Sequence, residues 1–142
     1  LWEMGIEYRR EIEQGYVIKN SIRWGDDVIG FGLFAEEHLD KGAYICEYVG
    51  EVRQLSRWKK DINPYCFHYP TRFWSWNYFA IDAANRGNEL RFINHSDTPN
   101  LEPAWVIDRG LLHLILRAAV PIKKGTELTF NYGPDFWRHR ER

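Results

Sequence analysis

The segment from residue 91 to residue 100 constrains the fold of this chain more than any other. Its sequence is Arg-Phe-Ile-Asn-His-Ser-Asp-Thr-Pro-Asn. Pro99 lacks a backbone N–H and disfavours the α conformation at Thr98, so this segment cannot be a regular helix. Asn94, His95 and Ser96 place several donors and acceptors in one short turn. Such a turn either binds a polar small molecule or is a loop held together by its own side chains.

Length and composition exclude several classes of protein. A chain of 142 residues is long enough for one domain with a hydrophobic core. Its net charge of −1 gives no electrostatic footprint for nucleic acid, so no direct nucleic-acid binding is expected. No apolar run approaches the ~20 residues that span a bilayer, so no membrane partner is expected. Cys46 and Cys66 are too few for a disulfide framework or a four-ligand zinc site, which favours an intracellular setting.

Most of the chain has the pattern of short strands separated by turns. Residues 28–35 are apolar with two glycines, which predicts a strand around a tight bend. Residues 111–120 form a short apolar run between Gly110 and Pro121, which favours a strand over a helix. Residues 1–15 are predicted to form a short helix or a flexible flank, and residues 54–63 a polar helix or loop. The fold class is therefore mainly β with little helix.

One pattern occurs twice. Lys41-Gly42 precedes an apolar segment that closes at Gly50, and Lys124-Gly125 precedes a similar segment that closes at Gly133. Each copy predicts a turn with glycine in the left-handed conformation, followed by a strand that runs to the closing glycine. Two copies indicate related β units and not a solenoid, which needs three or more repeats.

Four motifs, in this order, resemble those of the SET domain, the fold of many protein lysine methyltransferases. They are Gly-Phe-Gly-Leu-Phe-Ala at 30–35, Glu-Tyr-Val-Gly-Glu at 47–51, the polar segment 91–100 with residues 81–83 and 87–88 before it, and Glu-Leu-Thr-Phe-Asn-Tyr-Gly at 127–133. The resemblance covers roughly residues 22–137. It implies several small curved sheets and a C-terminal pseudoknot that brings residues 91–100 against Tyr132. The implied organisation is a flank at 1–21, a SET domain at 22–133 and a short aromatic and basic tail at 134–142.

The resemblance also implies a reaction. SET enzymes move a methyl group from S-adenosylmethionine to a neutral lysine amine, leaving S-adenosylhomocysteine, and they need no metal for this step. The displacement is in line, so alignment supplies much of the acceleration. The lysine must lose a proton from a group whose reference pKa is ~10.4, which the sulfonium charge and an apolar channel both favour. Expected substrates are lysine-containing peptides or proteins, histones or other basic chromatin proteins. The expected location is the nucleus for histone targets and otherwise the cytoplasm, and a homodimer is possible.

Matching the motifs residue by residue implies roles for individual side chains. Tyr132 and Tyr65 match catalytic tyrosines, and the substrate channel would be lined by these two with Phe130 and Phe136. A phenylalanine at position 130 resembles members that add two or three methyl groups. The implied cofactor-binding residues are Gly30, Phe31, Gly32, Arg91, Phe92, Asn94, His95 and Trp137. For Tyr132, His95 and Trp137, a packing role in the core is the alternative.

The chain departs from the longer family members in one respect. Many relatives carry a zinc-binding cysteine where Asp97 stands and more cysteines after the closing motif, whereas no cysteine follows Tyr132 here. The resemblance therefore implies no zinc cluster and a compact form similar to viral and bacterial members. The competing function is a catalytically inactive SET-like module that binds proteins or peptides. The intact set Asn94, His95 and Tyr132 argues against it.

Overall fold

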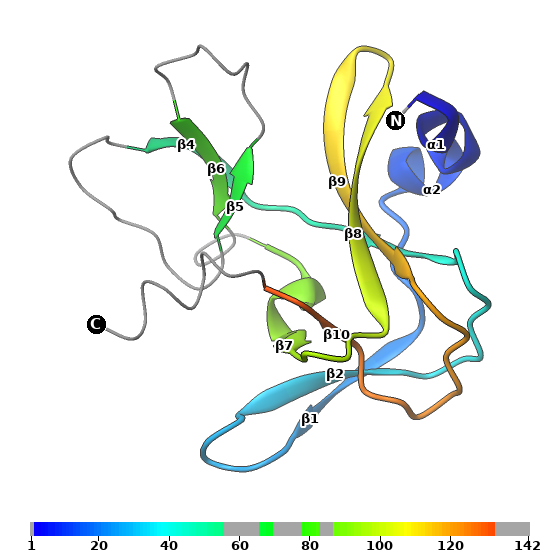
Figure 1. The fold of residues 1–142 in the computed structure, drawn as a ribbon, viewed down its shortest axis with the longest axis vertical. Helices are drawn as coiled ribbons and strands as arrows, with labels where there is room; N and C mark the ends of the chain where they lie inside the picture. The colour runs from blue at the N-terminus through cyan, green and yellow to red at the C-terminus, as the bar shows by residue number, and fades with distance from the viewer. Residues whose placement is uncertain (1, 56–65, 70–77, 83–86, 133–142) are drawn as a thin grey trace. The chain divides into compact units, whose positions relative to one another are not determined.

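The computed structural model describes residues 2–55, 66–69, 78–82 and 87–132 (Figure 1). Strands dominate these ranges, with two short α-helices and one short 3₁₀ helix. The chain divides into two compact units, the first formed by residues 1–48 with 92–142 and the second by residues 49–91. This composition confirms the prediction of a mainly β chain. No helix in the described ranges is long and apolar enough to cross a bilayer.

The first unit begins with two helices, α1 (Trp2–Glu7) and α2 (Arg9–Gln14). Gly15 ends α2 in the left-handed conformation, with φ of 58° and its N–H directed to carbonyls of the last turn. Tyr8 and Ile12 are buried in a core cluster with Val106 and Ile115. Of the two alternatives for residues 1–15, the helix is therefore the correct one, and it packs on the sheet of this unit (Figure 1).

That sheet is antiparallel and has the order β3 (Tyr44–Glu47), β9 (Leu111–Ala118) and β8 (Leu101–Asp108). β9 confirms the strand expected at 111–120. Its central side chains are fully buried because it lies between the other two strands. Arg109 and Gly110, with φ of 50° and 79°, close the long β8–β9 hairpin that dominates Figure 1.

A separate hairpin pairs β1 (Asn20–Trp24) with β2 (Phe31–Ala35). The strand expected over 28–35 begins only at Phe31, because the preceding residues form the turn. Asp26 Oδ1 accepts the backbone N–H groups of Val28 and Ile29 at 2.9 and 2.7 Å, and so uses these groups outside the strand ladder. β1 starts at residue 20, so the expected boundary between 21 and 22 falls inside this strand.

The two repeated turns pair with each other. Gly42 and Gly125 are left-handed, with φ of 84° and 87°, as the repeat predicts. Leu39 and Ile122, each three residues before the glycine of its turn, exchange two backbone hydrogen bonds of 2.8 Å in an antiparallel bridge. The strands that follow are shorter than expected, because β3 ends at Glu47 and β10 is only Thr129–Phe130. After β10 the Tyr132 N–H turns to a side chain and does not extend the ladder.

The second unit contains an antiparallel sheet of order β4 (Glu51–Leu55), β6 (Tyr78–Asp82) and β5 (Cys66–Tyr69). The helix or loop expected at 54–63 is wrong at its start. Residues 54 and 55 complete β4, because all five residues of that strand pair in register with β6. Sheet pairing thus overrides the low strand propensity of this polar stretch. The rest of that expectation, residues 56–63, lies outside the described residues.

Candidate active site

The candidate site forms where two short segments far apart in sequence run side by side. β10 pairs in parallel with β7 (Asn94–His95), with Thr129 opposite Asn94 and Phe130 opposite His95. The Ser96 N–H extends this pairing by donating to the Phe130 carbonyl at 3.2 Å. The predicted approach of residues 91–100 to Tyr132 is therefore confirmed.

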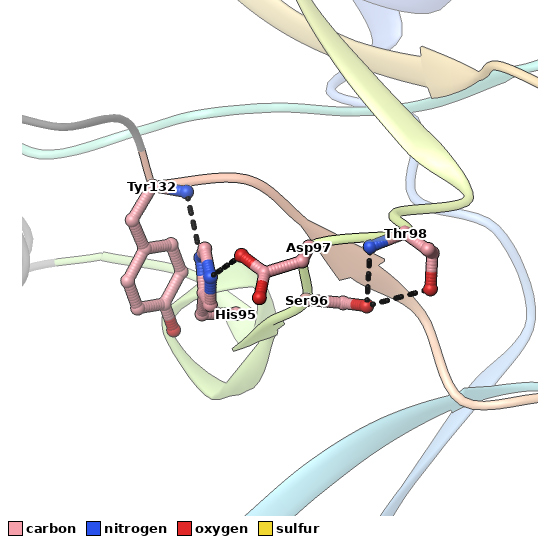
Figure 2. A network of polar contacts seen from close by, with 5 residues as sticks. All are labelled: His95, Ser96, Asp97, Thr98 and Tyr132. Carbon is pink, nitrogen blue, oxygen red and sulfur yellow. Dashed lines mark hydrogen bonds and ion pairs between the residues drawn. The ribbon is translucent and has the colours of Figure 1, made fainter.

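The polar segment has the irregular backbone that Pro99 predicts. A 3₁₀ helix, η1 (Glu89–Phe92), leads into β7, and a turn follows it. In this turn Ser96 Oγ accepts the Thr98 N–H at 3.1 Å and lies 3.4 Å from the Thr98 hydroxyl (Figure 2). Ser96 thus holds the loop locally, which leaves Asn94 and His95 to make the long-range contacts.

His95 is fixed by both of its ring nitrogens (Figure 2). The Tyr132 backbone N–H donates to Nδ1 at 3.1 Å, and Nε2 lies 3.0 Å from Asp97 Oδ1. Because Nδ1 accepts a hydrogen bond, the proton belongs on Nε2, where it is donated to the Asp97 carboxylate. The imidazole is therefore the neutral Nε2–H tautomer, and its ring lies 5.3 Å from the Tyr132 ring.

Tyr132 has an oriented hydroxyl within an aromatic setting. Its hydroxyl donates to the Ile93 carbonyl at 2.5 Å, and its ring lies 4.8 Å from that of Phe130. Phe130 and Ile93 are buried, whereas Tyr132 is only partly so. The phenolic proton is therefore directed to Ile93, and the oxygen of a phenol is also a hydrogen-bond acceptor. The sequence predicts a role for this hydroxyl but gives no sign of its carbonyl partner.

Asn94 connects this centre to the glycine-containing strand β2. Its Nδ2 donates to the Phe31 carbonyl at 3.1 Å and to Glu127 Oε1 at 2.9 Å. The Phe31 ring packs edge-on against Phe92, with ring centroids 5.9 Å apart. The structure thus brings together three of the predicted cofactor residues, Phe31, Phe92 and Asn94, beside His95.

The two glycines of the Gly-Phe-Gly motif are needed for different reasons. Gly30 has a φ of 73°, a conformation that favours glycine, and the space around its Cα is open. Gly32 has no such backbone requirement, but a Cβ there would lie 2.6 Å from Glu127 Oε1. The backbone conformation explains the glycine at position 30, and the contact with Glu127 explains the glycine at position 32. Their expected contact with a cofactor stays a prediction.

Glu127 and Asn100 are site residues to which the sequence alone assigns no role. Asn100 Nδ2 donates to the Glu127 carbonyl at 2.8 Å, and Asn100 Oδ1 accepts the Thr129 N–H at 2.9 Å. One amide side chain thus replaces a pair of strand hydrogen bonds along the segment that leads into β10. No local sequence signal identifies either residue, because their hydrogen-bond partners lie about thirty residues away.

Four predicted site residues are not placed beside this centre by the described coordinates. Tyr65, Phe136 and Trp137 lie outside the described residues, and Arg91 belongs to the second unit. Their expected roles stay predictions. Within the described ranges, no three histidine, cysteine, aspartate or glutamate side chains are grouped as a metal site would require.

In this chain of small sheets, the parallel β7–β10 pair joins an Asn-His segment to a closing tyrosine. This is the arrangement that the resemblance to the SET domain implies. The family model described as "SET domain" matches residues 30–133, and the chain belongs to this family. Histone-lysine N-methyltransferase Su(var)3-9 of Drosophila melanogaster is 37% identical over 114 residues, which cover 72% of this chain and 18% of that protein. Putative histone-lysine N-methyltransferase ASHH4 of Arabidopsis thaliana is 37% identical over 108 residues, 72% of this chain and 30% of that protein.

Among solved structures, the chain is similar to KRYPTONITE in a crystal structure with mCHH DNA, an H3(1-15) peptide and SAH. The TM-score is 0.69 at 32% identity, and the match covers 84% of this chain and 24% of that one. The similarity confirms the SET fold that the four motifs imply. The chain spans less than a third of the length of these relatives, so only their SET regions are compared here.

Proposed function

We propose that this domain is an S-adenosylmethionine-dependent protein lysine N-methyltransferase. The observation that carries the proposal is the β7–β10 pairing, because it fixes Tyr132 against both His95 and the Ile93 carbonyl. Two features of the relatives support it. The relatives in the comparison are named histone-lysine N-methyltransferases, and the KRYPTONITE structure contains SAH, the product form of the cofactor.

In this proposal Tyr132 acts by orientation. Its hydroxyl proton is held by Ile93, so its oxygen accepts from the lysine amine N–H and keeps the nitrogen lone pair directed at the methyl group. Phe130 forms an apolar wall that accommodates the lysine stem and, through its ring face, a methylated ammonium. Tyr65 and Phe136 are proposed as further channel residues. The sulfonium charge and the low dielectric of such a channel favour the neutral amine.

The cofactor is proposed to lie against β2, the first strand within the family match, and against the Asn-His segment. The groups that would hold it are Gly30, Phe31, Gly32, Arg91, Phe92, Asn94, His95 and Trp137. Both ring nitrogens of His95 hydrogen-bond within the chain, so this side chain supports the pocket as an oriented neutral ring. The transfer of a methyl group from a sulfonium to an amine requires alignment and no metal.

The proposed substrate is a lysine in an extended basic peptide of the histone type. An H3(1-15) peptide is bound in the KRYPTONITE structure, and peptides of this kind are commonly recognised along a strand edge. A histone substrate would place the enzyme in a nucleus. Phe130 leaves room at the channel where a tyrosine hydroxyl would stand, so we propose that the enzyme adds two or three methyl groups. A homodimer is also proposed, and direct DNA binding is not.

The experiment that tests the proposal is transfer of tritiated methyl from S-adenosylmethionine to mixed histones. We expect incorporation by the wild type and a loss of about 100-fold in kcat for Tyr132→Phe, because one positioned dipole at the reacting centre is removed. Tyr16→Phe is the matched control, since that exposed phenol lies outside the site and its removal should leave transfer unchanged. Cofactor binding without transfer by the wild type would favour the inactive binding module. Mass spectrometry of a peptide array then gives the site and the number of methyl groups, and an exclusively monomethyl product would contradict the role of Phe130.

A further inference from the structure

We infer that Glu127 is a positioning residue of the cofactor site and that Gly32 is a glycine because of this carboxylate. The inference rests on the proposed function, because it concerns binding of the proposed cofactor. It goes beyond what the resemblance implies, because the resemblance assigns Gly30 and Gly32 to cofactor binding and gives Glu127 no role.

The first step is the contact between Glu127 and Asn94. Asn94 Nδ2 has two N–H groups, and they are donated to Glu127 Oε1 at 2.9 Å and the Phe31 carbonyl at 3.1 Å. These two acceptors fix the rotation of the amide, and Asn94 Oδ1 is the atom of this side chain that can accept a hydrogen bond from a ligand. Without the carboxylate, the Phe31 carbonyl would be the one acceptor left to this amide among the described residues, and a single contact does not fix its rotation.

The second step is the origin of the carboxylate's own position. The Glu127 backbone carbonyl accepts Asn100 Nδ2 at 2.8 Å, and the next residue donates its N–H to the Leu33 carbonyl at 2.8 Å. Glu127 also forms an antiparallel bridge with Phe34 of β2. The residue is therefore anchored by its backbone between β2 and the Asn-His segment, and its side chain extends across Gly32.

The third step is the space above Gly32. A Cβ on Gly32 would lie 2.6 Å from Glu127 Oε1 and 3.3 Å from its Cδ, while Phe34 Cε2 would be at 3.2 Å. Gly32 does not have a positive φ, so alanine suits its backbone. The main obstacle to alanine is thus the end of a flexible side chain. Gly32→Ala should fold but push the carboxylate away from Asn94.

These contacts make the two positions energetically dependent on each other. Gly32→Ala and Glu127→Ala both remove the same hydrogen bond to Asn94, one by displacing the carboxylate and the other by deleting it. In a Glu127→Ala background the alanine methyl at position 32 has room, so it should add little. Residues that act through one contact show this non-additivity in a double-mutant cycle.

The test is calorimetric titration of S-adenosylhomocysteine into the wild type, Gly32→Ala, Glu127→Ala, the double variant and Glu127→Gln. We expect each of the two single alanine variants to weaken binding about tenfold, which is the effect of one charge-assisted hydrogen bond. The double variant should be no more than about twofold weaker than Glu127→Ala. Glu127→Gln should stay within about threefold of the wild type, because its amide oxygen still accepts from Asn94. Glu36→Ala removes another hydrogen-bonded carboxylate, outside the site, and should bind as the wild type does.

The outcomes separate this inference from the proposed function. A wild type that binds no S-adenosylhomocysteine overturns both. A wild type that binds, with Gly32→Ala and Glu127→Ala losses that simply multiply in the double variant, overturns the inference and leaves the enzyme proposal standing. Glu127→Gln as weak as Glu127→Ala also overturns it, since the negative charge and not the hydrogen bond to Asn94 would then matter. If Glu127→Ala fails to fold, Gly32→Ala and Glu127→Gln decide: equal, wild-type affinities in both refute the inference.

Discussion

Asn100→Ala should loosen the closing segment of the site and lower stability by a predictable amount. The side chain makes two long-range hydrogen bonds, from Nδ2 to the Glu127 carbonyl and from the Thr129 N–H to Oδ1, at 2.8 and 2.9 Å. At about 1 kcal/mol each, their loss lowers the free energy of unfolding by about 2 kcal/mol. For a chain of this size that corresponds to a fall in Tm of roughly 6 °C. The backbone bond from the Ala119 N–H to the Asn100 carbonyl is unaffected by this change.

The measurement is urea unfolding, with activity assayed at a temperature where both proteins are folded. Asn20→Ala is the matched control, because that amide makes one local hydrogen bond, to the Ile18 carbonyl at 2.9 Å. We expect Asn100→Ala to reduce methyl transfer as well, since Thr129 lies in the strand that positions Tyr132, whereas Asn20→Ala should keep full activity. A loss of stability no larger than that of Asn20→Ala would refute the conclusion that the two Asn100 side-chain hydrogen bonds hold the segment that leads into β10.

Two further predictions concern the core of the first unit. Gly5→Ala should destabilise the protein, because the new Cβ would clash with the Ile107 carbonyl oxygen. This is expected although alanine is the better helix former by about 1 kcal/mol. A higher Tm would contradict the docking of α1 on β8. Tyr44→Phe should stabilise by about 1 kcal/mol, because the Tyr44 hydroxyl is buried and hydrogen-bonds to no atom of the described residues. Burial raises the pKa of Tyr44, so the folded state holds the phenolic proton more tightly than the unfolded state does. The stability of the wild type is therefore independent of this group below the unfolded pKa of about 10 and falls as the pH rises above it. Thermal melts from pH 8 to 11 should show that loss in the wild type and less of it in Tyr44→Phe.

The sequence predicts well those features that depend on neighbours in the chain. Pro99 excludes a helix across the polar segment, Gly42 and Gly125 mark left-handed turns, and the run before Pro121 is a strand, all as the structure has them. Each of these follows from the conformational limits of one or two residues. The shortness of β10 does not follow in this way, because it depends on where the Tyr132 N–H finds its acceptor.

The same distinction between local and long-range determinants applies to the candidate site. The resemblance to the SET family predicts that residues 91–100 meet Tyr132, which composition and spacing do not. Neither source predicts that Ile93 would hold the phenol or that Glu127 would lie over Gly32. These are contacts between backbone groups or long side chains across about thirty residues or more, and no local pattern encodes their partners. The N-terminal helices likewise need the buried face of Tyr8 and Ile12 to be matched with a sheet more than thirty residues away.

The parallel β7–β10 pair has a consequence for the order of events in folding. Two residues on each side cannot hold together alone, and the loop between them must close before either gains from the contact. On the ribosome, the Asn-His segment is complete long before its partner strand emerges. The candidate site is therefore expected to be among the last parts of the domain to mature, after the β8–β9 hairpin has formed within the closing loop.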